Sequence, residues 1–226
     1  MAYRYAKRSF DLINSILALI ILSPLFLIIA FGIKLSSEGP VFYVSERIGL
    51  DGKPFSMYKF RTMHIKREGE EESQYLVNTQ RIFKFGSFLR KSKLDELPQL
   101  LNVFLSNMSV VGPRPYPQAI TDRLYVGKYQ VILSVKPGLS CFDSLYDYAH
   151  GELFVADDDM YRTEVLPVRT ELAKMYIDKK SIRVDAGIIL RTISLIWKIT
   201  IRKQSDFEYS KYEKNAILLV KSEKVR

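Results

Sequence analysis

The sequence predicts an α+β fold that is mostly helical: an N-terminal membrane helix, a break and a second helix, then one small domain with amphipathic helices at the membrane interface. Three observations predict it. A 22-residue run near the N-terminus carries no charge, apolar residues recur at helical spacing after residue 94, and extended stretches are few and short. With 226 residues, 47% of them hydrophobic, the chain can bury one core. We expect an anchor over 1–36, the main domain over 37–203 and a charged tail over 204–226.

The uncharged run covers residues 12–33. As a helix of roughly 1.5 Å per residue it is about 33 Å long, enough for a hydrocarbon core of about 30 Å. Ser23 and Pro24 lie in its middle, and proline kinks a helix because it lacks an N–H. Length alone therefore allows a plain span or a re-entrant hairpin that breaks at Ser23-Pro24. A cleaved signal peptide fits less well, because its apolar region is usually about 7–15 residues long.

Basic residues lie on both sides of this run. Arg4, Lys7 and Arg8 precede it, and Lys34 is the first of several that follow it. Positive residues favour the cytoplasmic side of a membrane. A straight span places one flank on each side, whereas a hairpin returns both flanks to the cytoplasm. The charges therefore favour the hairpin without excluding the span.

After the anchor the pattern predicts extended segments at 41–44 and 55–63, joined by a turn at 49–54, where Asp51-Gly52 is a turn signal. The charged residues 66–73 predict an exposed loop or a helix start. Helices are predicted over 94–105, 124–135, 165–179 and 181–201. The last of these has a broad apolar face with Trp197 and a basic opposite side. This composition is typical of a helix in the membrane interface, and also of a core helix whose basic side contacts water.

The charge balance indicates an anionic partner. There are 34 Lys and Arg against 25 Asp and Glu, a net charge of +9, which suits nucleic acid, a phosphate-bearing substrate or an acidic membrane face. Cys141 is the single cysteine, and His64 and His150 are the two histidines. These counts exclude a disulfide framework, a cysteine zinc finger and a three-histidine metal site. The chain has no P-loop or Gly-x-Ser-x-Gly motif, and nucleic-acid binding has no motif behind it.

Two adjacent carboxylates, Asp95 and Glu96, form the first candidate site. Proline is tolerated in a first helical turn, so Pro98 predicts that a helix starts close to Asp95 or Glu96 and directs its positive end at both acids. Neighbouring helical residues diverge by about 100°, so the two acids suit different roles: attack or metal binding for one, proton transfer or a second metal bond for the other. The structural alternative is a helix cap, because Ser92-x-x-Asp95 matches a capping box.

Three cations are further candidates for binding phosphate. In a strand, Lys59 and Arg61 share one face, where they would hold a diphosphate. Prolines on both sides of Arg114 fix its backbone, and a guanidinium matches the geometry of phosphate. The alternatives are a solvated strand edge or headgroup contact for the first two, and a surface arginine on a stiff loop for the third.

Taken together, these motifs resemble the monotopic phosphoglycosyl transferases of bacterial envelope glycan pathways, the bacterial sugar transferase family. The resemblance covers about residues 5–201 and is to the small form of the family, without the extra multi-span region of its larger members. The motifs that carry it are Lys7-Arg8-Ser9-Phe10-Asp11, Ser23-Pro24, Gly39-Pro40-Val41-Phe42, Glu46-Arg47-Ile48-Gly49, Gly52-Lys53-Pro54-Phe55, Tyr58-Lys59-Phe60-Arg61-Thr62-Met63, Leu94-Asp95-Glu96-Leu97-Pro98-Gln99-Leu100-Leu101-Asn102 and Met108-Ser109-Val110-Val111-Gly112-Pro113-Arg114-Pro115.

The resemblance implies transfer of a phosphosugar from a nucleotide diphosphate sugar, usually UDP-linked, to polyprenyl (undecaprenyl) phosphate, with release of UMP. It makes Asp95 the nucleophile that forms an aspartyl-phosphosugar intermediate. Mg²⁺ is the implied cofactor, held by Asp95 and Glu96, and taking the acceptor's proton is the other role open to Glu96. The implied substrate- and phosphate-binding residues are Lys59, Arg61, Arg90, Arg114 and Asp185.

The resemblance also implies the re-entrant hairpin, and with it a location on the cytoplasmic face of a bacterial inner membrane. The catalytic domain would then be cytosolic and reach both a soluble donor and a lipid acceptor. Two rival interpretations are a non-catalytic, membrane-associated scaffold of glycan assembly and a bitopic protein with a basic nucleic-acid-binding domain. The pair Asp95-Glu96 and its surrounding cations favour the enzyme, and we expect no nucleic-acid partner.

One region departs from the family. Its members commonly read Lys-Pro-Gly-Ile-Thr-Gly-Trp, where this chain has Lys136-Pro137-Gly138-Leu139-Ser140-Cys141-Phe142, and residues 143–152 are atypical as well. We expect this departure to affect recognition of the donor's base or sugar and to leave the chemistry of Asp95 intact.

Overall fold

The structure is a computed structural model that describes residues 2–65, 79–150, 158–202, 204 and 207–224. The stretch 66–73, predicted as a loop or a helix start, lies outside these residues. The described part is mostly helical with two small sheets, which confirms the predicted α+β class. One sheet pairs β1 (Phe42–Ile48) with β2 (Pro54–Phe60), and the other pairs β3 (Ser109–Val111) with β4 (Gly138–Ser140).

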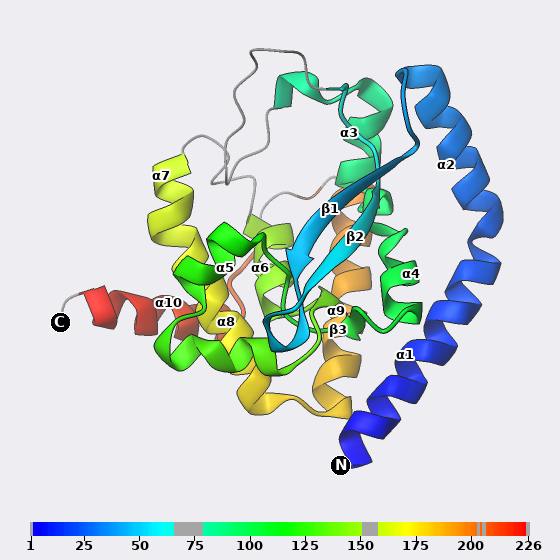
Figure 1. Cartoon of the computed structure of the whole chain (residues 1–226). Helices are drawn as coiled ribbons and strands as arrows, with labels where there is room; N and C mark the ends of the chain where they lie inside the picture. The colour runs from blue at the N-terminus through cyan, green and yellow to red at the C-terminus, as the bar shows by residue number, and fades with distance from the viewer. Residues whose placement is uncertain (1, 66–78, 151–157, 203, 205–206, 225–226) are drawn as a thin grey trace.

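Two helices, α1 (Ala2–Ile21) and α2 (Ser23–Ser36), form a bent pair along one side of the molecule (Figure 1). Pro24 has no N–H to offer the carbonyl of Ile20, and the hydroxyl of Ser23 donates to that carbonyl instead, at 2.8 Å. The helices bend by 60° at this point, so the predicted break is confirmed. Among the described residues no single helix is long and apolar enough to cross a membrane, whereas this pair is when its two helices are taken together.

The β-hairpin indicated after the anchor is present, with a longer first strand and a shorter second strand than predicted. Strands β1 and β2 are antiparallel, with Phe42 opposite Phe60 and Ile48 opposite Pro54. A short 3₁₀ turn, Leu50–Gly52, joins them. Helix α2 packs on the far end of this hairpin and on α3 (Lys84–Lys91), where its buried Ile29 and Ile33 join Phe60 in one apolar cluster.

Helix α1 is held against the domain by two of its polar residues. The guanidinium of Arg8 donates to the carbonyls of Val103 and Phe104, at 2.8 and 3.0 Å, where α4 (Gln99–Phe104) ends. The carboxylate of Asp11 accepts the backbone N–H of Val110 in β3, at 3.0 Å. The motif that includes Arg8 and Asp11 therefore joins the first helix to the main chain of the domain.

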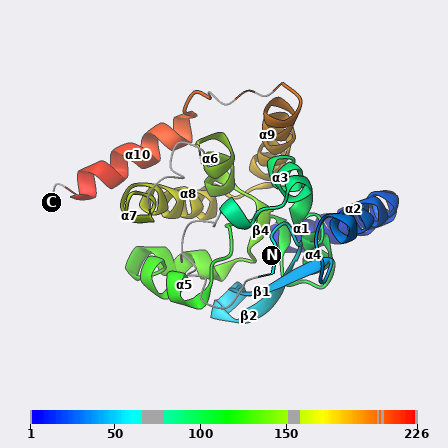
Figure 2. The ribbon, with the colours of Figure 1, turned by 90° about the horizontal axis from the view of Figure 1, so that it is seen from above.

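The largest core lies among the C-terminal helices. It gathers side chains from α5 (Gln118–Leu124), α6 (Phe142–His150), α8 (Leu166–Lys179), α9 (Ile182–Thr200) and α10 (Lys211–Lys224). Helix α7 (Asp158–Met160) and a π-helical turn, Tyr161–Val165, lead into α8. Figure 2 shows α10 beside α6 and α8, on the side of the domain away from the hairpin.

Three expectations need correction. The helix predicted over 94–105 is a 3₁₀ turn, Leu94–Glu96, followed by α4. The helix predicted over 124–135 is a 3₁₀ segment, Gly127–Ser134. The predicted charged tail contains α10, whose Ala216 and Val220 are buried in the main core. Helices α8 and α9 agree with the two remaining predictions, and the exposed Trp197 lies on α9.

Strands β3 and β4 approach closely at two glycines, which yields a first testable prediction. A Cβ added at Gly138 would lie 2.1 Å from the backbone nitrogen of Gly112. Since neither backbone can yield without separating the strands, we expect Gly138→Ala to lower the free energy of unfolding by about 3 kcal/mol. Denaturation of the detergent-solubilised protein measures the change. The control is Gly187→Ala in α9, where a Cβ meets nothing within 4 Å and should stabilise by about 0.5–1 kcal/mol. Equal stabilities of the two variants would contradict this account.

Candidate active site

The two adjacent acids lie in the 3₁₀ turn Leu94–Glu96, and both are buried. Lys93 precedes the turn in the left-handed conformation, with φ of 57°. The hydroxyl of Ser92 donates back to the carbonyls of Phe88 and Leu89, so it does not cap this turn and the capping-box alternative is wrong. The α-helix begins only at Gln99, later than predicted.

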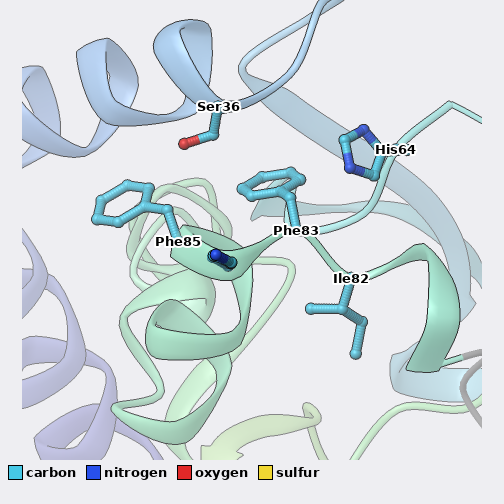
Figure 3. A pocket seen from close by; sticks show the side chains of 6 residues that line it. Ser36, His64, Ile82, Phe83 and Phe85 are labelled. Carbon is cyan, nitrogen blue, oxygen red and sulfur yellow. The ribbon is translucent and has the colours of Figure 1, made fainter.

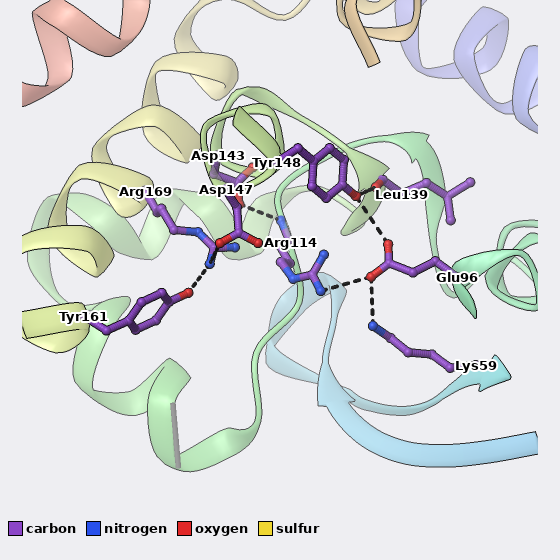
Figure 4. A network of polar contacts seen from close by, with 9 residues as sticks. All are labelled: Lys59, Glu96, Arg114, Leu139, Asp143, Asp147, Tyr148, Tyr161 and Arg169. Carbon is purple, nitrogen blue, oxygen red and sulfur yellow. Dashed lines mark hydrogen bonds and ion pairs between the residues drawn. The ribbon is translucent and has the colours of Figure 1, made fainter. Parts of the chain in front are cut away.

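Glu96 is the centre of a polar network that draws on several elements (Figure 4). Its Oε1 accepts from Lys59 Nζ of β2 at 2.8 Å and from the guanidinium of Arg114 at 3.1 Å. Its Oε2 accepts from the hydroxyl of Tyr148 of α6 at 3.3 Å. Burial disfavours the charged form of Glu96, but Lys59 and Arg114 outweigh it and hold the pKa of this carboxyl well below its usual range. Glu96 is therefore ionised and holds two cations side by side.

Asp95 differs sharply from its neighbour. Its Oδ1 is buried and accepts no hydrogen bond from any of the described residues. Burial and the charge of Glu96 raise the pKa of the Asp95 carboxyl, while Lys59, Lys93 and Arg90 oppose the shift. The expectation that the two acids have different roles agrees with this contrast. A buried carboxylate oxygen without a partner is poised to bind a cation or to attack an electrophile.

Arg114 is aimed by its loop as the prolines predicted. Its backbone N–H donates to Asp143 Oδ2 at 3.0 Å, and its guanidinium reaches Glu96. The Coulomb attraction of Glu96 outweighs burial and raises the pKa of Arg114. Behind it lies an ion pair, in which the buried Arg169 of α8 donates to Oδ1 of the partly exposed Asp147 at 3.2 Å and also to the hydroxyl of Tyr161. The loop and α6 thus form one continuous network.

Of the other predicted phosphate ligands, Arg90 remains close to the acids. It lies on α3, half-buried, and its charge acts on Asp95. Arg61 is engaged elsewhere: its guanidinium donates to Ser37, the carbonyl of Pro40 and the carbonyl of Met63, which ties the end of the hairpin to the loop after α2. These contacts use all three of its nitrogens, and none of them is to Asp95 or Glu96.

Asp185 belongs to a different cluster. One of its oxygens accepts from Lys7 Nζ at 2.7 Å and from the hydroxyl of Tyr3 at 2.9 Å. The other accepts from the hydroxyl of Tyr176 at 2.9 Å. Asp185 therefore joins α1, α8 and α9, and the structure does not bring it to the network around Glu96.

Sequence reasoning missed five residues of the site: Lys93, Asp143, Asp147, Tyr148 and Arg169. Three of them lie in the atypical segment 143–152, and Lys93 and Arg169 belong to none of the motifs described above. The departure from the family pattern at residues 143–152 was the one available signal, because α6 supplies Asp143, Asp147 and Tyr148 to the network. The departing Cys141 and Phe142, by contrast, are buried in the main core, where Phe142 stacks on Tyr212 of α10 with ring centres 4.4 Å apart.

A metal ion would meet few ligands here. In the part of the chain that the structure describes, no group of three or more His, Cys, Asp or Glu side chains could hold one. Mg²⁺ commonly binds one or two carboxylates together with substrate phosphates, and the unpartnered Oδ1 of Asp95 fits that mode. Glu96 fits it less well, because both its oxygens already accept hydrogen bonds from Lys59, Arg114 and Tyr148.

A cavity of about 460 Å³ lies apart from this network, between the C-terminal end of α2 and the N-terminal end of α3 (Figure 3). Its lining side chains include Ser36, His64, Phe83 and Phe85. None of them contacts Glu96 in the structure, so the cavity is not part of the site formed by the two acids.

Comparison with known proteins agrees with this geometry. The family model of the bacterial sugar transferases matches residues 2–199. The chain belongs to the bacterial sugar transferase family. The matched range includes both acids, Lys59, Arg114 and α6, and it ends before α10.

Three curated relatives illustrate the similarity. The UDP-glucose:undecaprenyl-phosphate glucose-1-phosphate transferase of Escherichia coli (strain K12) is 36% identical over 84% of this chain and 40% of its own length. The protein of the same name from Caulobacter vibrioides is 34% identical over 83% of this chain and 68% of its own. Exopolysaccharide production protein ExoY of Rhizobium meliloti is 36% identical over 84% of this chain and 85% of its own. This family member thus spans about two fifths of the length of the Escherichia coli relative.

Proposed function

We propose that this protein transfers a phosphosugar from a UDP-linked sugar to undecaprenyl phosphate, with release of UMP. The observation that carries the proposal is the pair of buried acids, in which Asp95 has an unpartnered oxygen and Glu96 holds Lys59 and Arg114 beside it. The names of relatives such as the Escherichia coli glucose-1-phosphate transferase support the donor and acceptor classes. A scaffold would need neither the free carboxylate oxygen nor the paired cations.

The transfer proceeds in two steps. An oxygen of Asp95 attacks the sugar-bearing phosphorus, the bond from that phosphorus to the bridging oxygen breaks, and UMP leaves with that oxygen. A phosphate oxygen of the lipid then attacks the same phosphorus, and the bond to Asp95 breaks to regenerate the carboxylate. Dividing the transfer in this way lets one site serve a soluble donor and then a lipid acceptor.

The cations of the site bind and orient the phosphates. Lys59 and Arg114 converge on one oxygen of Glu96, so their remaining N–H groups are held at a fixed separation for a second anion. Arg90 adds positive charge near Asp95. Bound at Asp95, Mg²⁺ would offset the charge of the diphosphate and favour the ionised form of the carboxyl.

We further propose that α1 and α2 form a re-entrant hairpin in the cytoplasmic leaflet of a bacterial inner membrane. The bend of 60° and the basic residues on both flanks support this topology. Large apolar side chains of the pair are exposed, which is costly in water and typical of a lipid contact. They include Ile20, Ile21, Leu27, Ile28, Phe31 and Leu35. Helix α9 exposes Ile193 and Trp197 and fits an interfacial helix.

Release of UMP by the detergent-solubilised protein tests the proposed reaction. A panel of UDP-sugars is offered with Mg²⁺, with and without undecaprenyl phosphate. We expect steady turnover with one donor only when the lipid is present, and at most one equivalent of UMP per protein without it. Absence of UMP release across the panel by folded protein would refute the proposed activity. Removal of Mg²⁺ with a chelator should abolish turnover, and re-addition should restore it.

A further inference from the structure

Tyr148 lies on the face of α6 that meets Glu96 (Figure 4), and its side chain is buried. Its hydroxyl is 3.3 Å from Glu96 Oε2 and 3.5 Å from the carbonyl oxygen of Leu139. A tyrosine hydroxyl has one proton to donate. Because Glu96 is ionised and closer, the carboxylate is the stronger acceptor of the two. The hydroxyl of Tyr148 therefore donates its hydrogen bond to Oε2 of Glu96.

The other oxygen of the same carboxylate holds the cations. Lys59 and Arg114 both donate to Oε1, at 2.8 and 3.1 Å. A carboxylate is planar, so the direction of Oε2 fixes the direction of Oε1. When Tyr148 holds one oxygen, rotation about the end of the Glu96 side chain is restricted, and Oε1 keeps the direction in which it accepts from the two cations.

The ring of Tyr148 makes a second contact that also holds the segment of the two acids in place. Lys93 Nζ lies over the ring, 4.3 Å from its centre, within the range of a cation–π interaction. Lys93 immediately precedes the turn with the two acids and takes the left-handed conformation there. Tyr148 therefore makes two contacts at this turn, one with the residue that precedes it and one with Glu96.

We propose that Tyr148 is a positioning residue: through Glu96 it holds Lys59 and Arg114 in the arrangement that binds the diphosphate of the donor. This inference rests on the proposed function and names the residue that sets the geometry of its phosphate site. Tyr148 lies in residues 143–152, the segment that departs from the family pattern. This segment therefore contributes a side chain to the phosphate site.

Binding of UDP, measured by titration calorimetry with Mg²⁺, tests the inference without turnover. Tyr148→Phe keeps the ring over Lys93 and removes the hydroxyl alone. We expect it to weaken UDP binding about threefold to tenfold, the value of one hydrogen bond. In a Glu96→Gln background the charged acceptor is gone, so the same change should weaken binding less than about twofold. With the active donor, KM should rise by the factor seen for UDP, a change that a loss of folded protein would not produce.

The control is Tyr146→Phe, which removes a hydroxyl from the same helix on the side where the ring packs near Tyr209. It should leave UDP binding unchanged. Equal losses from Tyr148→Phe in both backgrounds would mean that Tyr148 contacts the nucleotide directly, and would overturn the inference. So would unchanged binding by Tyr148→Phe in the wild-type background. If wild-type protein binds no UDP and releases no UMP, the proposed function is overturned and this inference with it.

Discussion

Asp95→Asn is expected to abolish transfer, lowering UMP release on the order of 10⁴-fold or more. An amide lacks the negative charge that attacks phosphorus, so the covalent route is closed. The fold should tolerate the change, because no residue that the structure describes donates a hydrogen bond to Asp95 Oδ1. Burial already raises the pKa of Asp95, so a neutral amide of the same shape removes a cost. We therefore expect lost activity together with an equal or higher free energy of unfolding.

Two measurements check this prediction: UMP release, and thermal unfolding in the same detergent. Asp178→Asn is the matched control, since Asp178 is an exposed carboxylate on α8 that pairs only with Lys174 among the described residues. It should alter neither quantity. Asp95→Asn protein that keeps more than about a tenth of the wild-type rate would mean that another group attacks the donor.

Arg169→Leu is expected to lower the free energy of unfolding by about 3–5 kcal/mol. Arg169 is buried on α8 and is the partner of Asp147, whose pKa it helps to lower against the effect of burial. It also opposes the raised pKa of the buried Asp143. Removing the guanidinium leaves the buried Asp143 and the partly exposed Asp147 without this counter-charge. Chemical denaturation followed by near-UV circular dichroism measures the loss.

The control for this variant is Arg162→Leu, since Arg162 is half-exposed and pairs with an exposed Asp159. An exposed pair contributes at most about 1 kcal/mol, so this change should be close to neutral. A loss below about 1 kcal/mol for Arg169→Leu would show that water, and not Arg169, compensates the charges of α6.

The sequence predicted those parts of the fold and the site that depend on local chemistry. The break follows from Pro24 and the missing N–H, and the hairpin from Asp51-Gly52 between extended runs. Local features made Asp95 and Arg114 candidates, but each had a structural alternative, and the family resemblance made them site residues. The break and the turn act within a few residues of the chain, so periodicity and turn chemistry are sufficient to detect them.

What the sequence could not predict depends on contacts between distant segments. Arg61 and Asp185 carry suitable charges, but Arg61 donates to nearby main-chain groups and Asp185 pairs with Lys7, 178 positions away. Tyr148 reaches Glu96 only because β4 and α6 bring it there. The polar composition of α10 concealed that its Ala216 and Val220 enter the core. Tertiary packing decides each of these outcomes, and no local pattern records it.

The attachment of α1 has a consequence for membranes of different thickness. Arg8 and Asp11 bind main-chain groups of Val103, Phe104 and Val110, which no side-chain rotation can move. With α1 in the lipid as proposed, the depth of this helix in the membrane determines the height of Asp95 above the hydrocarbon. A thinner or thicker bilayer then tilts or shifts the whole molecule, because stretching this connection would break hydrogen bonds to the backbone. The distance from the reacting carboxylate to the lipid phosphates is thereby set by the protein.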